Sequence, residues 1–378
     1  MSYAYKSRLV RFIAYLIDFI GEILFFWIKK NPVIEKGAIK KVLVVKLDHL
    51  GDSFLITPLF KYLIKNFPDV KIDILCSDLA KPIFENNPYI AKIITFNYFR
   101  TSRGNGKKAG LKESLQLIKD LRKERYDLFI DARGELFVSL LGFLTGARYR
   151  VGFEREEIGG FLHTNSLTYN PEQHEIEKNK IILKAFNITS NEWHPKIYIN
   201  EDEKLRINDL LNENFSKPIA VIHISAGLPY KMWPIENFAE IITAVSKEYN
   251  YEFALLGGNN DRVLVQKLFE VIKTTDGVVD LVGNFTIRES YYFLSKVKLF
   301  IGNDSVLGHF AGSLGIPTII LMNGLINKNR WYPLGRNVNV LTGYDMNHNC
   351  LFDDCNYPCP HMEAIKMEEV IGLVREML

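Results

Sequence analysis

FIGNDSVLGHFAGSLGIPTIIL, residues 300–321, contains an apolar strand, a turn, a short helix and a second apolar strand. The apolar runs are continuous rather than alternating, which is typical of strands that a parallel sheet buries on both faces. The turn carries Asn303, Asp304 and Ser305, and His309 follows one helical turn later. A purely structural turn needs only one good cap, so this cluster of polar side chains indicates a binding site.

The same alternation of strands and helices continues through most of the chain. The predicted strands are 41–47, 71–77, 90–96, 127–133 and 149–153, then 218–225, 251–257, 278–283, 298–304 and 317–323. Helices are expected at 52–66 and 111–125 in the first series, and at 236–249, 260–274, 287–296 and 306–314 in the second. Two such series predict an α/β fold with two Rossmann-like, doubly wound domains whose polar strand ends face a central cleft.

The length of 378 residues suits two domains. We expect an amphipathic helix within 1–36, a first α/β domain at 37–200 and a second at 201–345. Residues 346–378 should form a cysteine-containing tail with a terminal helix, at about 362–377, that packs back on the protein.

The charge distribution argues against a nucleic acid as the main partner. Net charge is only +3, and the first 41 residues hold eight Lys or Arg against three acids, so the basic excess belongs to the N-terminus. Four cysteines in a chain of this length argue against a disulfide-stapled secreted fold. The apolar N-terminal stretch contains acids and lacks a small-residue cleavage site, so no signal peptide is predicted and a cytoplasmic protein is expected.

RLVRFIAYLIDFIGEILFFWIKK, residues 8–30, is the most apolar stretch of the chain. Its apolar residues favour membrane insertion by about 4–8 kcal/mol, and its two acids, Asp18 and Glu22, oppose it by about 3 kcal/mol each. The net free energy of inserting this stretch across a membrane is therefore close to zero. On a helix, the charged residues fall within an arc of about 80°. This single polar stripe favours a helix lying in a bilayer surface; packing on the protein or a second subunit, or a true span, are the alternatives.

The loop KLDHLGDSFLITP, residues 46–58, follows the first strand. Gly51 allows a sharp turn and Asp52 starts the next helix, where its carboxylate could serve only as an N-cap. Asp48 supplies a second acid in the same loop. Two carboxylates at the carboxyl end of a strand suit general-base chemistry on a hydroxyl.

The stretch HISAGLPYKMWP, residues 223–234, follows the first strand of the second series. Ser225 and Gly227 are small enough for a ligand to approach the backbone, and Lys231 offers a point charge that can stabilise a phosphate. A solvated surface lysine is the alternative for Lys231. Trp233 is expected to pack in the core, and His223 is at least as consistent with a core histidine as with a ligand.

The opening stretch also predicts an anion site at a helix N-terminus. Ser305 is the expected cap, and the free N–H groups of Val306 and Leu307 would be reinforced by the helix dipole. Asp304 cannot itself attract a phosphate, so it should orient neighbouring donors or a sugar hydroxyl. His309 can reach the same space, although a cap with a buried histidine is the alternative.

A fourth stretch, LLGGNNDR (255–262), ends a strand with two glycines. Gly257 would let a nucleoside lie beside the backbone, a weak signal when taken alone.

Taken together, these stretches resemble glycosyltransferase family 9, the ADP-heptose:lipopolysaccharide heptosyltransferases and their relatives. The family pattern R-x-D-x-x-G-D followed by Pro appears at 46–52 and Pro58, with Lys46 in place of Arg. K-x-W-P appears at 231–234, and G-N-D-S-G-x-x-H with A-x-x-L-G-x-P appears at 302–317. Val306 stands where the family usually has glycine, and its branched side chain could crowd a phosphate or sugar.

The resemblance implies a GT-B fold and an inverting, metal-independent glycosyltransferase. By this resemblance Asp52 would be the general base, Lys231 would hold the donor phosphates, and residues 304–307 would stabilise the departing nucleoside diphosphate. The donor would be a nucleotide-diphosphate sugar, with ADP-heptose expected, and the acceptor a lipopolysaccharide core or another glycolipid or glycan. No cofactor or metal is expected, and attachment to the inner face of the cytoplasmic membrane follows from such an acceptor. The alternative is a non-catalytic nucleotide-sugar-binding regulatory or scaffold protein.

The tail CLFDDCNYPCPH, residues 350–361, brings Cys350, Cys355 and Cys359 together in sequence, with His348 and His361 nearby. Their gaps are not those of common C-x-x-C zinc sites, and by resemblance such cysteines are a feature of family members. Ordinary thiols are therefore the main expectation, with a metal site or a redox-sensitive pair as alternatives.

Overall fold

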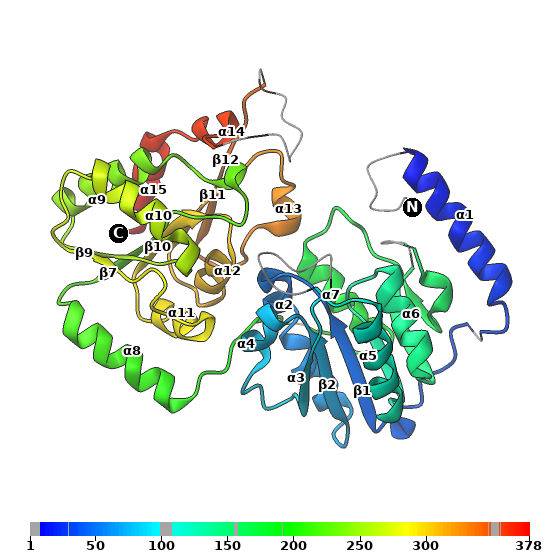
Figure 1. The fold of residues 1–378 in the computed structure, drawn as a ribbon. Coiled ribbons are helices and arrows are strands. Elements are labelled where there is room, and N and C mark those ends of the chain that lie inside the picture. Colours follow the sequence, from blue (N-terminus) through cyan, green and yellow to red (C-terminus); the bar gives the residue numbers. More distant parts are fainter. Residues whose placement is uncertain are drawn as a thin grey trace. The chain divides into compact units, whose positions relative to one another are not determined.

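The computed structural model describes residues 8–28, 30–98, 108–154, 158–190, 192–346, 348, 355 and 357–378. The chain divides into two compact units, Met1–Ile197 and Tyr198–Leu378, each built around its own sheet (Figure 1). The division falls close to the expected boundary at residue 200. The N-terminal helix contacts the first unit and the terminal helix contacts the second.

The first unit contains a six-stranded parallel sheet in the order β3-β2-β1-β4-β5-β6. Its strands are β1 (Lys41–Lys46), β2 (Lys71–Cys76), β3 (Lys92–Thr95), β4 (Leu128–Asp131), β5 (Tyr149–Phe153) and β6 (Asn165–Leu167). Its helices are α1 (Arg8–Leu24), α2 (Leu50–Leu55), α3 (Pro58–Asn66), α4 (Lys81–Phe84), α5 (Leu111–Lys123), α6 (Leu136–Thr145) and α7 (Glu175–Lys184). Short 3-10 turns lie at η1 (Lys36–Ala38), η2 (Asp78–Ala80) and η3 (Gly160–Leu162).

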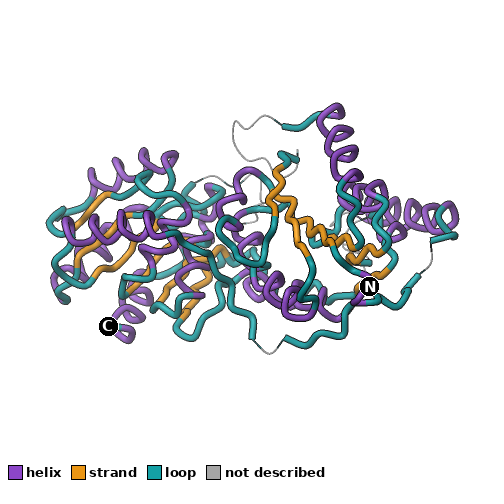
Figure 2. The backbone as a smooth tube through the Cα atoms, turned by 90° about the horizontal axis from the view of Figure 1, so that it is seen from below, coloured by secondary structure: helices purple, strands orange, loops and turns teal. Residues whose placement is uncertain are grey.

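Helices cover both faces of this sheet (Figure 2). The helices α5 and α6 pack together, and their Leu121 and Leu141 join Leu43, Val45 and Phe129 of the sheet in one buried cluster. Elsewhere in the unit, α7 packs against α2 and α3. The central strand β1 is therefore buried on both sides, as its continuous apolar run predicts.

The second unit repeats this topology, with strand order β12-β11-β10-β7-β8-β9 and all pairs parallel. Its strands are β7 (Ile219–His223), β8 (Glu252–Leu255), β9 (Val278–Asp280), β10 (Leu299–Asn303), β11 (Thr318–Asn323) and β12 (Val338–Gly343). Its helices are α8 (Glu201–Asn214), α9 (Ile235–Glu248), α10 (Arg262–Val271), α11 (Ile287–Leu294), α12 (Val306–Ser313), α13 (Lys328–Trp331), α14 (Pro360–Glu363) and α15 (Met367–Met377). Its 3-10 turns are η4 (Pro229–Lys231) and η5 (Asn259–Asp261).

The predicted fold class, two doubly wound Rossmann-like domains, is confirmed, whereas two predicted helices need correction and two strands were missed. The helix expected at 52–66 is two helices, because Pro58 starts α3 and cannot continue the hydrogen bonding of α2. The helix expected at 362–377 is likewise divided into α14 and α15. The edge strands β6 and β12 are largely half-exposed or exposed, so they lack the continuous apolar run on which the strand predictions rested.

The helix α1 places its two acidic residues, half-buried Asp18 and exposed Glu22, beside the first unit. The Oδ1 atom of Asp18 accepts a hydrogen bond of 3.0 Å from the N–H of Gly159. Asp18 and Glu22 line a cavity of about 440 Å³ together with Lys30, whose Nζ donates to the carbonyls of Phe161 and His163. Polar residues of the helix and of the segment just after it therefore have partners inside the first unit.

Packing against η3 holds α1 in this orientation. The ring of Phe25 lies 5.3 Å from that of Phe143 and 5.5 Å from that of Phe161. Gly21 lies directly against the Phe161 ring, and Ala14 is fully buried. Within the described residues, no helix combines the length and the apolar character needed to cross a bilayer.

We expect the substitution Gly21→Leu to detach α1 from the first unit. A Cβ atom at residue 21 would lie 2.5 Å from the Phe161 ring, so one of the two must move. Limited proteolysis followed by mass spectrometry should show faster cleavage between α1 and β1 in this variant. Gly37→Leu is the matched control, because a Cβ there meets no atom within 4 Å. An unchanged cleavage rate in Gly21→Leu would contradict the packing.

Candidate active site

In both sheets the strand order reverses between two central strands, β1 and β4 in the first and β7 and β10 in the second. The connections leave these strands toward opposite faces, so a crevice opens at their carboxyl ends, where ligands bind in open parallel sheets. All three motifs that suggested a site in the sequence follow one of these strands. Each unit therefore offers a candidate half-site.

Asp48, which follows β1, is buried and ion-paired. Its Oδ2 lies 2.9 Å from the Nζ of Lys46, and its Oδ1 contacts the guanidinium of Arg133, which follows β4. The ammonium of Lys46 is itself buried, donates to the Ala132 carbonyl at 3.1 Å and lies 3.6 Å from Glu175. Asp48 thus neutralises two cations, so it is poorly placed to accept a proton from a substrate.

Burial lowers the pKa of Lys46, and the carboxylates of Glu175 and Asp52 act in the opposite direction. Removing an ammonium from water costs several kcal/mol unless charges of opposite sign compensate it. The acids around Lys46 supply that compensation. They also fix the end of β1 to the end of β4 and to α7.

Asp52 has a different environment from Asp48. It is the third residue of α2 and is half-buried, and His49 occupies the N-cap position. The interpretation of Asp52 as an N-cap is therefore wrong. The first turn of a helix favours a negative charge, so Asp52 combines partial exposure with a setting that suits a carboxylate base.

In the second unit, Lys231 and Asp304 form an ion pair. The Nζ of Lys231, at the end of η4, lies 2.8 Å from Oδ2 of Asp304, directly after β10. Both side chains retain some exposure, 23% for Lys231 and 10% for Asp304. The ion pair therefore holds the ammonium of Lys231 in one position and leaves it partly exposed.

Two buried asparagines hold the loop that carries Lys231. Asn303 accepts from the Trp233 N–H at 3.0 Å and donates to the Ile224 carbonyl at 2.9 Å. Asn323, at the end of β11, donates to the Tyr230 carbonyl at 2.9 Å. Both side chains are fully buried, so these bonds fix the loop at several points.

Ser305 occupies the N-cap position of α12, but its side chain makes no capping hydrogen bond. The expected side-chain cap is therefore wrong. Its Oγ atom is buried and has no hydrogen-bond partner within the described part of the chain. An unpaired buried hydroxyl next to the N–H groups of Val306 and Leu307 is a position where a bound anion could satisfy several donors.

His309, one turn into α12, is nine-tenths buried. Contacts within the protein itself explain most of the other candidate residues of the second unit. His223 is buried, its Nδ1 donates to the Leu256 carbonyl at 2.8 Å, and burial lowers its pKa, so it is a satisfied core histidine. The Oγ atom of Ser225 lies 3.5 Å from Nε2 of His223, and Gly227 is exposed. A Cβ on Gly257 would lie 2.6 Å from the Asp261 carboxylate, so this glycine makes room for a side chain of the protein itself.

Sequence analysis missed Arg133, Glu175 and Asn323. Arg133 and Asn323 come at the carboxyl ends of β4 and β11, each adjacent to a strand whose motif was recognised. The rule that neighbouring parallel strands end at one edge would have identified both. Glu175 lies in a polar region before α8 whose tertiary contacts no local pattern reveals.

Comparison with known proteins agrees with this arrangement. The family model "Glycosyltransferase family 9 (heptosyltransferase)" matches residues 114–361. The chain belongs to glycosyltransferase family 9. It is 28% identical over 338 residues to lipopolysaccharide heptosyltransferase 3 of Escherichia coli (strain K12), covering 87% of this chain and 95% of that protein.

Two solved structures share the fold. The glycosyltransferase family 9 protein of Veillonella parvula DSM 2008 superimposes with a TM-score of 0.75 at 21% identity, covering 89% of this chain and 97% of that one. The E. coli heptosyltransferase WaaC with ADP gives 0.68 at 18% identity, covering 89% and 100%. The paired Rossmann-like units of this glycosyltransferase are those of the predicted GT-B fold.

We expect Lys46→Met to destabilise the first unit by about 3 kcal/mol, because it leaves buried Asp48 and Glu175 without their shared cation. Chemical denaturation followed by circular dichroism would measure the loss. Lys92→Met is the matched control, since Lys92 pairs with Glu124 at the surface and should change stability by less than about 1 kcal/mol. Equal stabilities for the two variants would contradict the role assigned to Lys46.

Proposed function

We propose that this protein is an inverting, metal-independent glycosyltransferase that moves heptose from a nucleotide diphosphate, ADP-heptose, to a lipopolysaccharide-core or related glycan acceptor. The relatives support the donor and acceptor classes, since one carries the name lipopolysaccharide heptosyltransferase and another was solved with ADP. The observation that carries the proposal is the oriented, partly exposed Lys231 together with the unpaired Ser305 hydroxyl at the α12 N-terminus.

The second unit would stabilise the leaving group. When the bond between the sugar and the diphosphate breaks, negative charge grows on the phosphate oxygens. Lys231 and the N–H groups at the start of α12 are preorganised donors for that charge, which is the role that a metal ion plays in other transferases. This arrangement supports transfer without a metal.

The first unit would activate the acceptor. In a single displacement, the acceptor oxygen attacks the anomeric carbon as the nucleoside diphosphate leaves, which inverts the configuration at that carbon. The proton of the acceptor hydroxyl then needs a base. Asp52 suits this role because it is half-buried at the start of α2, whereas Asp48 is committed to Lys46 and Arg133.

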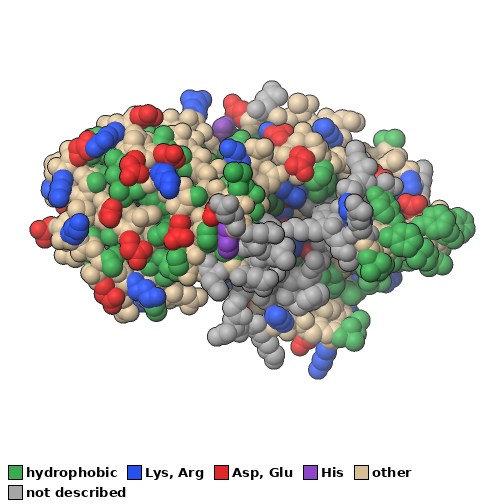
Figure 3. Space-filling view, turned by 90° about the horizontal axis from the view of Figure 1, so that it is seen from above, with side chains coloured by type: hydrophobic (Ala, Val, Ile, Leu, Met, Phe, Trp, Pro, Cys, Tyr) green, Lys and Arg blue, Asp and Glu red, His purple; other side chains and the backbone are tan. Residues whose placement is uncertain are grey.

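We further propose that the helix α1 attaches the enzyme to a membrane surface, close to a lipid-linked acceptor. Hydrophobic side chains gather over α1 (Figure 3). Large apolar residues that are more than half exposed on and just after this helix are Leu9, Phe12, Phe19, Ile23, Leu24, Phe26 and Trp27. Asp18 bonds to the protein and Glu22 lines the cavity beside it, which leaves the apolar side chains of the helix available to enter a bilayer surface.

We expect Asp52→Asn to lower kcat by about 10²–10⁴-fold while leaving ADP binding unchanged. Turnover would be followed with ADP-heptose and a lipopolysaccharide-core acceptor, and ADP binding by thermal shift. Full turnover in Asp52→Asn would remove this carboxylate from the mechanism.

Lys231→Ala separates the donor role from the acceptor role. It should weaken ADP binding, which Asp52→Asn should not, because Lys231 is assigned to the diphosphate. Binding of ADP without any sugar transfer by the wild-type enzyme would instead favour the non-catalytic alternative, for which the half-exposed Val306 side chain at the α12 N-terminus leaves room.

We expect the triple substitution Phe12→Ser, Phe26→Ser and Trp27→Ser to weaken binding to phospholipid vesicles at least about a hundredfold, from the lost burial of three large apolar side chains. Co-sedimentation with vesicles containing anionic lipid would measure it. The control replaces Leu111, Leu205 and Val263, which are exposed elsewhere on the molecule, with serine. Equal vesicle binding by both triple variants would exclude α1 as the attachment surface.

A further inference from the structure

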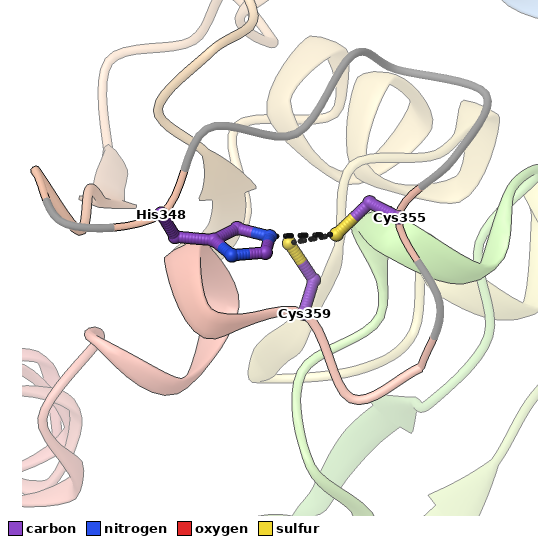
Figure 4. Close-up of side chains that lie close together, drawn as sticks. All are labelled: His348, Cys355 and Cys359. Atoms are coloured by element: carbon purple, nitrogen blue, oxygen red, sulfur yellow. Dashed lines mark hydrogen bonds between the residues drawn. The ribbon is translucent and has the colours of Figure 1, made fainter.

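Three potential metal ligands come together in the tail of the second unit, outside the candidate active site. The Nε2 atom of His348 lies 3.4 Å from the Sγ of Cys355, and that sulfur lies 3.1 Å from the Sγ of Cys359. All three ligand atoms fall within 4.8 Å of one another. Figure 4 shows the imidazole and both sulfur atoms directed at one point.

We propose that His348, Cys355 and Cys359 bind one divalent metal ion of the zinc class. Two thiolates and an imidazole are donors that Zn²⁺ prefers, and three protein ligands leave one further tetrahedral position. In such a site, ligand bonds of about 2.0–2.3 Å place neighbouring ligand atoms roughly 3.5–3.8 Å apart. The histidine–sulfur distance of 3.4 Å is close to this, and the two sulfurs, now 3.1 Å apart, would have to separate by about 0.6 Å to admit an ion. No two of the three ligand atoms are more than 4.8 Å apart.

The surroundings of Cys359 support a thiolate. Cys359 is fully buried, and the Nδ2 of Asn323 donates to its Sγ at 3.4 Å. Amide donors of this kind stabilise the negative sulfur of a metal-bound cysteine.

His361 supports the cluster rather than completing it. Its ring lies 5.3 Å from that of His348 and stacks on Tyr344. Its Nδ1 accepts the Asp345 N–H at 2.9 Å, which places the ring proton on Nε2 and removes that atom as a ligand. A Cys355–Cys359 disulfide is the alternative, but it would not account for the nearby His348 imidazole or for the hydrogen bond that Asn323 donates to Cys359.

The proposed ion would brace the loop of Lys231. Asn323, which donates to Cys359, also donates to Tyr230, the residue before Lys231. Two further bonds join the same segments, from the Ile235 N–H to the Tyr357 hydroxyl at 3.0 Å and from Trp233 Nε1 to the Ile365 carbonyl at 3.2 Å. The metal is thus structural, and transfer itself needs no ion in the reaction.

The test is metal analysis of the full-length protein purified without chelator under reducing conditions. We expect close to one zinc per chain in the wild type, and loss of that zinc in His348→Ala and in Cys359→Ser. The controls are His194→Ala and Cys76→Ser, which remove an exposed histidine and a buried free thiol of the first unit. Zinc should remain at the wild-type level in both.

A spectroscopic measurement keeps the proposal testable if a variant fails to fold. Wild-type protein loaded with Co²⁺ should show thiolate-to-cobalt charge-transfer absorption, and a strong chelator should lower the Tm of the zinc-loaded form. Substoichiometric metal with no such absorption would overturn the proposal. So would a Cys355–Cys359 disulfide, detected by mass spectrometry after alkylation without reduction.

Discussion

The reversal of strand order in each parallel sheet is the constraint on which the candidate site depends. Between β1 and β4, and again between β7 and β10, the following segments turn away to opposite faces, so the side chains at each pair of strand ends lie at a crevice of their own unit. Sheets buried on both faces have few other places for charged groups. The charged residues of the motifs lie at these strand ends, where buried ones such as Lys46 and Asp48 are compensated by charges of opposite sign.

The two units use this position in different ways. In the first, Lys46, Asp48 and Arg133 neutralise one another in a buried network, and Asp52 stands beside it on α2. In the second, the Lys231–Asp304 pair keeps some exposure, and buried amides rather than buried charges hold its loop. The buried charge network of the first unit suits the positioning of a base, whereas the partly exposed ammonium of the second unit suits the binding of a phosphate.

Much of the fold was predictable because buried parallel strands leave continuous apolar runs, and the strand 149–153 was located to the residue. The edge strands β6 and β12 were not predicted, because their side chains are partly exposed and need not form a continuous apolar run. The role predicted for Asp304, orienting a neighbouring donor, rests on its charge and stays a prediction. The pairing of Asp48 with Arg133 was not predicted, because it joins residues far apart in sequence through the sheet register. Cys350 lies outside the described residues, as does most of the stretch 100–110, whose basic residues and glycines predict a loop.

The helix α1 shows how tertiary contacts can reverse the meaning of a sequence pattern. An isolated amphipathic helix turns its charges to water, but here the Gly159 N–H and Lys30 offer the acids partners inside the first unit. The broad apolar face is then left outward, where a monomer in water gains nothing from it. The proposed attachment to a bilayer surface would resolve this conflict, since the exposed apolar side chains would enter lipid while Asp18 keeps its partner in the protein. The contacts of the polar residues with the first unit are therefore what leaves the apolar face available for such a surface.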